Sequence, residues 1–298
     1  KSETGAYVTL FLMALQSAIF SPSKYGIVPE LVSFDKISRA NGLLTSFTFL
    51  AIIIGTFLAS FIVDMSSRNF VFAGVFCTIV AVVGMFASFR IEYTPPMGHK
   101  KKANPFFFYE IYRTIMRSRQ ENRLFCAILG SSFFLFVAAY IQLNIIPFGI
   151  EALNLSDVKG GYLFLLTAVG IGTGSMLSGK LSGKHVELGL VPFGGLGIVI
   201  SCFLIHAFSD SLSAVVINVI LLGIFGGIWI VPLDSFIQVS SPENYRGQMV
   251  ATTNFLSFTG VLAASGAIFF FNSIGVTASQ GFMIMGLITL VVTIFIMI

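Results

Sequence analysis

The feature that most constrains this chain is a succession of long apolar stretches separated by short polar gaps. A helix needs roughly 20 mostly apolar residues to cross the hydrocarbon core of a bilayer. Membrane β-strands are about 10 residues long and alternate in polarity, so the longer stretches here predict helices and an all-α membrane protein. Nine stretches qualify, at about 5–21, 41–63, 69–89, 124–147, 160–178, 188–208, 212–238, 250–271 and 276–298.

The composition agrees with a membrane protein and argues against a water-soluble domain. Hydrophobic residues make up 56% of the chain, the mean hydropathy is +0.93, and charged residues make up 10%, against about 25% in soluble domains. The net charge of +4 is explained by loops that face anionic lipid. The pattern does not indicate a nucleic-acid partner.

The distribution of Lys and Arg predicts the orientation of the spans, because short cytoplasmic loops hold the excess of these residues. Of the 17 basic residues, 14 fall in alternate gaps, beginning with the gap after the first span. The first span is therefore expected to run from outside to inside. Only Lys1, Arg68 and Lys159 fall on the opposite side.

The longest polar stretch divides the chain into three predicted parts. Residues 1–89 hold three spans, residues 90–123 form a basic cytoplasmic linker, and residues 124–298 hold six spans. Within the linker, Asn104 and Pro105 are a typical helix start, and residues 106–119 have the pattern of an amphipathic helix. We expect this helix to lie on the inner membrane surface, with a partner-binding role as the alternative.

An internal repeat appears when the first span is laid on the seventh. Pro22 lies over Pro232, and Arg39 lies over Arg246 at nearly the same offset. A six-helix repeat then predicts that the chain carries helices four to twelve of a twelve-helix protein. Two parallel six-helix halves are the plan of the major facilitator superfamily.

Two segments carry a narrower resemblance. Residues 16–31 with 38–43 closely resemble the fourth-helix signature of bacterial lysophospholipid transporters, and residues 161–166 with 170–175 look like the eighth helix of that group. This implies a multi-pass protein of the bacterial inner membrane that moves a lysophospholipid by alternating access, in contact with membrane lipids. The resemblance also implies a fused or associated acyltransferase as partner. The alternatives are an efflux transporter for amphipathic drugs or metabolites, and a transport-inactive anchor for acyltransferase domains.

Charged residues inside spans are costly and therefore mark candidate sites. Lys24 and Asp234 each follow a repeat proline by two residues and have opposite charges, which predicts that they face the space between the halves. Ser17, Ser21 and Lys24 share one helix face, bordered by Gln16. The alternative for these charges is contact with the membrane interface.

The fourth span carries a second candidate polar face, because Tyr140 and Asn144 lie one turn apart with Gln142 between them. The resemblance implies a basic residue near this point, and the chain has these neutral side chains instead. The face is expected either to line the substrate path or to bond a neighbouring helix.

A cytoplasmic gate is predicted from Arg39 and Arg246, with Glu30, Asp35 and Glu243 as available partners; the alternative is that these residues only set the topology. No residue cluster has metal-ligand or nucleophile spacing, so neither an enzyme nor a cofactor is expected. Glycines such as Gly170 and Gly174 lie inside an apolar span, so they are expected to allow close helix packing rather than to bind phosphate.

Overall fold

The computed structural model describes residues 3–66, 70–94, 106–183 and 185–297, and its ordered elements are all helical. Nine helices of the described part are long and apolar enough to cross a membrane, which confirms the all-α prediction and the nine spans. Helices satisfy their own backbone hydrogen bonds, as a lipid environment requires. The nine helices of the described part that could cross a membrane are α1 (Glu3–Gly26), α3 (Ile37–Met65), α4 (Phe70–Ser88), α6 (Asn122–Glu151), α7 (Asp157–Leu181), α8 (Leu190–Ala207), α9 (Leu212–Ser240), α10 (Arg246–Ser273) and α11 (Ala278–Met297).

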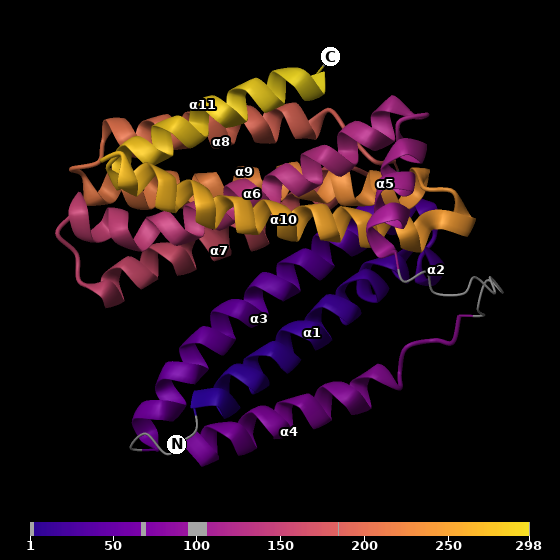
Figure 1. Ribbon diagram of the computed structural model, residues 1–298, viewed down its shortest axis with the longest axis horizontal. Coiled ribbons are helices and arrows are strands. Elements are labelled where there is room, and N and C mark those ends of the chain that lie inside the picture. Colours follow the sequence, from indigo (N-terminus) through magenta and orange to yellow (C-terminus); the bar gives the residue numbers. More distant parts are fainter. Residues whose placement is uncertain (1–2, 67–69, 95–105, 184, 298) are drawn as a thin grey trace.

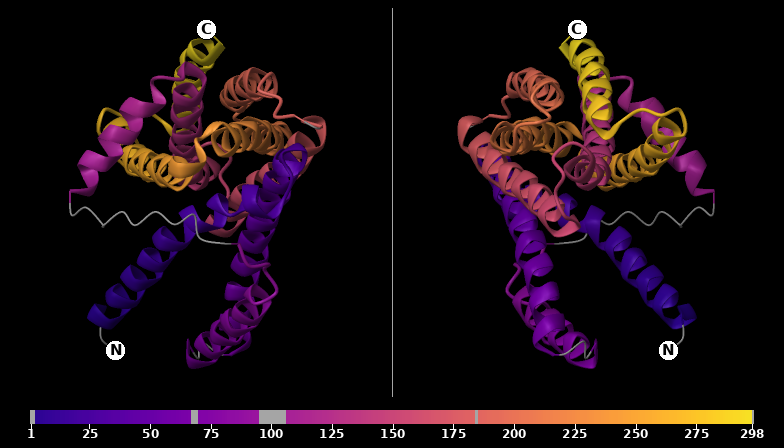
Figure 2. Two further views of the ribbon diagram at one scale, coloured as in Figure 1. Left: turned by 90° about the vertical axis from the view of Figure 1, so that its right-hand side faces the viewer. Right: turned by 90° about the vertical axis from the view of Figure 1, so that its left-hand side faces the viewer.

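The six helices from α6 to α11 form one bundle, and the three N-terminal helices lie to one side of it (Figure 1). Helix α1 meets the bundle near its C-terminal end, and helix α3 meets the bundle near its N-terminal end. Toward their other ends, both helices diverge from the bundle (Figures 1 and 2). Helix α4 lies farther out and packs against α3. By the predicted orientation, the halves meet at the cytoplasmic side and separate toward the outside.

The repeat proposed from the sequence has a structural counterpart in the connections. Helix α1 contains Pro22 and is continued by α2 (Val28–Leu31), and then by the 3-10 turn η1 (Phe34–Lys36), which leads into α3. Helix α9 contains Pro232 and is followed by the 3-10 turn η2 (Glu243–Tyr245), which leads into α10. Both halves therefore share the order proline-containing helix, 3-10 turn, helix. Superposition of the two prolines stays a prediction.

Glycines allow helices α7 and α9 to pack closely, as expected from the sequence. A Cβ atom added to Gly174 would overlap the backbone of Ile224, and one added to Gly227 would overlap the backbone of Ser175. Gly170 and Gly223 likewise face each other's backbones. Gly172 is different, because a Cβ atom added to it would lie 3.8 Å from the nearest described atom, the backbone oxygen of Ser46 in α3, which is an ordinary contact distance.

The amphipathic linker helix is α5 (Phe107–Ser118). Phe108 makes an edge contact with Phe255 at 6.0 Å between ring centroids, and the Arg117 guanidinium lies 4.2 Å from the centroid of Tyr245. Helix α5 therefore packs against the N-terminal part of α10 and the turn before it. The helix start predicted at Asn104 and Pro105 lies outside the described residues.

The orientation is tested by single cysteines placed at Lys101 and Lys159, in a background without the native cysteines Cys77, Cys126 and Cys202. A membrane-impermeant maleimide added to intact cells is expected to label the cysteine at position 159 and to reach position 101 only in inverted vesicles, because the two positions flank opposite ends of spans. Labelling of both positions from the same side contradicts the topology.

Candidate functional site

The two halves meet most closely where α3 crosses α7. A Cβ atom added to Gly42 would lie 2.5 Å from the backbone oxygen of Ser175 and 3.1 Å from the Cα of Gly179, so these helices touch backbone to backbone. One turn further along α3, the Ser46 hydroxyl donates a hydrogen bond to the carbonyl oxygen of Gly172. Small residues on both helices make this approach sterically feasible. The contact closes the predicted cytoplasmic end.

A buried amide pair adds polar contacts between the halves. The Asn41 amide nitrogen donates to the Gln238 side-chain oxygen at 3.0 Å, and the Gln238 amide nitrogen donates to the Asn41 oxygen at 3.1 Å. The Asn41 amide also donates to the Ser235 hydroxyl at 3.0 Å. Asn41 and Gln238 are each only 1% exposed, so water cannot easily replace these bonds. We call Asn41, Gln238 and Ser235 the amide latch.

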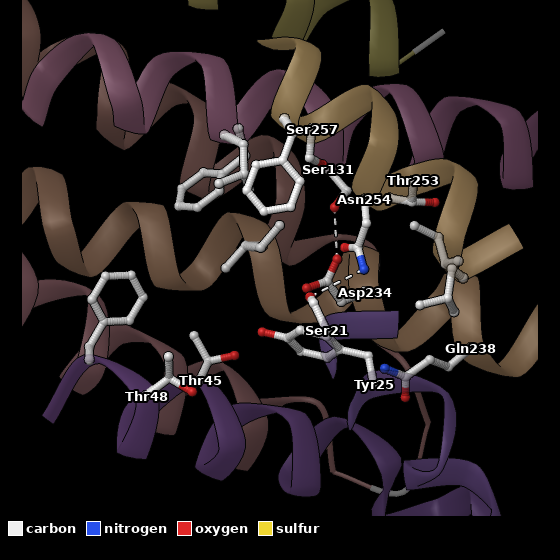
Figure 3. Close-up of a pocket in the computed structure, with 17 residues that line it drawn as sticks. Ser21, Tyr25, Thr45, Thr48, Ser131, Asp234, Gln238, Thr253, Asn254 and Ser257 are labelled. Atoms are coloured by element: carbon white, nitrogen blue, oxygen red, sulfur yellow. Dashed lines mark hydrogen bonds between the residues drawn. The ribbon is translucent and has the colours of Figure 1, made fainter. Parts of the chain in front are cut away.

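Directly beside the amide latch lies a cavity of about 220 Å³, formed by α1, α3, α6, α9 and α10 (Figure 3). We call it the central cavity. Its walls mix apolar side chains with hydroxyl, amide and carboxyl groups. Its polar lining residues are Ser21, Tyr25, Thr45, Thr48, Ser131, Asp234, Gln238, Thr253, Asn254 and Ser257.

Asp234 is the acidic group of the central cavity. Its Oδ1 accepts a hydrogen bond of 2.8 Å from the Ser131 hydroxyl (Figure 3), and within the described part of the chain no ion pair joins it to a cation. A buried carboxylate is costly without a partner. The cavity therefore offers a site where a cationic group of a ligand would gain a strong interaction.

Lys24 lies at the edge of the same cavity. Its Nζ donates to the Thr48 hydroxyl at 3.3 Å and lies 4.8 Å from the centroid of the Tyr25 ring. Thr48 and Tyr25 both line the cavity, and the ring of Tyr25 lies below Asp234 in the view of Figure 3. The two charges predicted to face the space between the halves are thus gathered near one cavity, but in the described structure they have separate partners.

The other predicted residues of α1 divide into two groups. Ser21 lines the central cavity and accepts a 3.2 Å hydrogen bond from the Asn254 amide of α10, which joins the halves (Figure 3). Gln16 and Ser17 lie nearer the outer end of α1 and are exposed. Gln16 borders a shallow groove formed by α1 alone.

The face formed by Tyr140 and Asn144 lies inside the C-terminal bundle instead of in the central cavity. The Asn144 amide donates to the carbonyl oxygen of Ala278 in α11 at 2.7 Å, and Tyr140 packs its ring edge-on to Phe271. The sequence left this alternative open, since a polar face also bonds neighbouring helices. Gln142 points the other way and lines a second, apolar cavity.

The residues of the predicted charged gate lie at the predicted cytoplasmic end. Glu30 and Arg246 line one cleft between α1 and α10, together with Glu243. Arg246 is 8% exposed, and its Nε has no hydrogen-bond partner among the described residues. Arg39 is exposed on α3. The neutral amide latch joins the halves near this end, and the charged gate stays a proposal.

Sequence reasoning missed several residues of the site. Asn41, Thr45 and Thr48 recur at intervals of four and three along α3, so they share one helix face, and that spacing was a readable signal. Ser131 is one of two adjacent serines on α6 and Asn254 follows two threonines on α10, so nothing in the sequence singles out either residue. Among the described residues, no group of three His, Cys, Asp or Glu side chains is arranged to hold a metal ion.

Comparison with known proteins agrees with this architecture. The chain is 29% identical over 255 residues to lysophospholipid transporter LplT of Klebsiella pneumoniae (strain 342), covering 83% of this chain and 62% of the relative. It is 28% identical over 269 residues to lysophospholipid transporter LplT of Enterobacter sp. (strain 638), covering 87% of this chain and 65% of the relative. The chain thus spans less than two thirds of the length of these relatives, and the resemblance drawn from the sequence is confirmed.

Solved structures with the same fold include the human organic anion transporter MFSD10 (TETRAN), with a TM-score of 0.76 and 15% identity over 93% of this chain and 67% of the other. A variant of the E. coli fucose:proton symporter FucP gives a TM-score of 0.71 at 15% identity, covering 93% and 72% of the two chains. The profile of the Major Facilitator Superfamily matches residues 4–265. The chain is therefore a multi-pass membrane protein that belongs to the Major Facilitator Superfamily.

Proposed function

We propose that this protein is a secondary transporter that moves a lysophospholipid across the bacterial inner membrane by alternating access. The observation that carries the proposal is the central cavity, which lies between the two halves and is closed on its cytoplasmic side by the amide latch and the Gly42 contact. Relatives described as lysophospholipid transporters support the choice of substrate.

The charges of the cavity suit a zwitterionic headgroup. Asp234 and Lys24 lie near the same cavity and are held apart by separate hydroxyl partners, Ser131 and Thr48. A phosphoethanolamine group carries a phosphate and an ammonium, so each end would meet the opposite charge. Such charge-assisted hydrogen bonds are roughly twice as strong as neutral ones.

The inward-closed arrangement of the structure supports one state of the cycle. Alternation requires the halves to separate at the cytoplasmic end and to meet at the outer end, as rigid bodies rocking around the cavity. Glu30, Arg39 and Arg246 remain proposed contacts that form and break during this step.

The proposal is tested with the full-length protein in liposomes, using fluorescent lysophosphatidylethanolamine and a reagent that quenches only the outer leaflet. Protein-dependent flipping is expected for this lipid and not for amphipathic drugs. Transport of the drugs alone would favour an efflux transporter. Absence of any transport by a stably folded protein would favour a membrane anchor for acyltransferase domains.

A charge-removal series tests the headgroup site. Lys24→Ala is expected to reduce transport of lysophosphatidylethanolamine and lysophosphatidylglycerol about tenfold or more, because each loses a charge-assisted bond worth about 1.5–3 kcal/mol. Asp234→Asn is expected to impair only the lipid with an ammonium. Lys180→Ala, at an exposed position near the end of α7, is the control.

Exchange of the two charges separates this site from a gate. In the Lys24→Asp and Asp234→Lys double variant, recovery of transport would assign the two residues to a gating pair instead of to the headgroup. Normal transport by both single variants would remove them from the mechanism.

A further inference from the structure

A second cavity adjoins the central cavity. It has a volume of about 290 Å³, and it shares three wall residues with the central cavity: Phe49, Phe134 and Leu135. Helices α6 and α7 provide most of the remaining wall, with smaller contributions from α3, α8, α9 and α10. The two cavities are thus neighbours that meet at these three side chains.

The chemistry of the second cavity is opposite to that of the first. Among the described residues that line it, only Gln142 and Thr167 are polar, and none is ionisable. Thr167 is satisfied within its own helix, since its hydroxyl donates to the carbonyl oxygen of Leu163 at 3.1 Å. The wall is therefore almost entirely apolar. A hydrocarbon is the occupant that this surface fits.

We infer that the second cavity is the acyl-chain subsite for a single-chain amphiphile whose headgroup occupies the central cavity. The inference rests on the proposed function and adds where the chain goes. A polar cavity next to an apolar one matches a molecule with one charged end and one hydrocarbon end. The combined volumes fall in the range of about 300–1,000 Å³ that is typical of ligand pockets.

The subsite gives a physical reason why the protein would select a lipid with one acyl chain over a lipid with two. Moving a chain through water is unfavourable in proportion to its apolar area, so a transported lipid gains from an apolar compartment that accompanies its headgroup. The second cavity is one compartment, and four residues of α7 form part of its wall: Phe164, Thr167, Ala168 and Ile171. A diacyl lipid would leave its second chain in the polar central cavity, beside Asp234 and Asn254.

The experiment varies the volume of the second cavity and the length of the lipid's acyl chain together. Ala138 lines the subsite and is half-buried on α6, so Ala138→Phe is expected to shorten it. In liposomes containing the full-length protein, this variant should lower transport of palmitoyl lysophosphatidylethanolamine about tenfold relative to the octanoyl lipid. Phe164→Ala should move the preference toward longer chains. Ala207→Phe, at an exposed position on α8, should leave the preference unchanged.

A binding measurement separates this inference from the proposed function. A palmitoyl lysophosphatidylethanolamine with a diazirine at the end of its chain is expected to cross-link the stretch of α7 that includes Phe164 and Ile171, and excess unlabelled lipid should prevent it. Equal loss of both chain lengths in Ala138→Phe, or cross-links confined to lipid-facing positions, would overturn the subsite even if the wild-type protein transports the lipid. No transport by the wild type would instead refute the proposed function.

Discussion

Replacing Gly42 with Leu is expected to hold the cytoplasmic end of the protein open and to reduce transport by about one to two orders of magnitude. At this position a Cβ atom alone would lie 2.5 Å from the Ser175 carbonyl oxygen and 3.1 Å from the Cα of Gly179. Both contacts are backbone, so no side chain can rotate away. Overpacking of this kind typically costs about 1–3 kcal/mol, which shifts a two-state equilibrium roughly 5- to 150-fold.

The measurement reads the conformation directly as well as the transport rate. A cysteine at Thr45, which lines the central cavity just beyond the amide latch, is expected to react faster with an impermeant maleimide from the cytoplasmic side when Leu replaces Gly42. Gly55→Leu is the matched control on the same helix, because a Cβ there meets no described atom within 4 Å. Equal reactivity and equal transport in both variants would mean that the α3–α7 contact does not control access.

The arrangement of spans was largely predictable because membrane helices have a strong signal in length and composition. In most cases the predicted span was shorter than the helix in the structure. For example, α3 begins at Ile37 rather than at residue 41, because Ser38 and Asn41 are polar residues that belong to the helix but lower its local hydropathy. Hydropathy marks the part of a helix within lipid, and the helix itself extends to its caps.

The candidate site was predictable only in part. The sequence shows which residues share a helix face, but it does not show which other helix that face contacts. The spacing of Tyr140 and Asn144 correctly places them on one face. The structure directs that face to α11 through the bond between Asn144 and Ala278. Conversely, Ser131 is one of two adjacent serines in α6, and it gains its role only because the fold brings Asp234 within 2.8 Å. Such contacts depend on helix packing between segments far apart in the chain.

The charged candidate residues were easier to identify from the sequence than the residues of the amide latch. Lys24 and Asp234 stand out because charges in spans are rare, whereas Asn41 and Gln238 are neutral residues near span ends, where polar side chains are common. Yet the structure joins the halves there through reciprocal amide bonds between buried side chains. A neutral pair suits a contact that must break, because it exposes no charge when the halves separate.

From the amide latch we predict which combinations of substitutions at Asn41 and Gln238 preserve the closed state. Asn41→Leu leaves the Gln238 amide buried without its partner, which costs about 1–3 kcal/mol in the closed state. Gln238→Leu does the same to Asn41, although Ser235 still accepts one bond from it. When both are replaced by Leu, no unpaired amide remains, so the closed state is expected to recover. The double variant should therefore be closer to wild type than Asn41→Leu is.

A double-mutant cycle on the accessibility of the Thr45 cysteine measures this coupling, which is expected to be about 0.5–3 kcal/mol for residues in contact. Asn218→Leu provides a matched control, because Asn218 is also a buried amide on α9, but among the described residues its nitrogen bonds the Ala214 carbonyl oxygen of the same helix and no group of the other half. It should change cytoplasmic access little, alone or combined with Asn41→Leu. Strictly additive effects of Asn41→Leu and Gln238→Leu would show that the two amides do not act on closure through each other, and would leave the Gly42 contact as the element that closes this end.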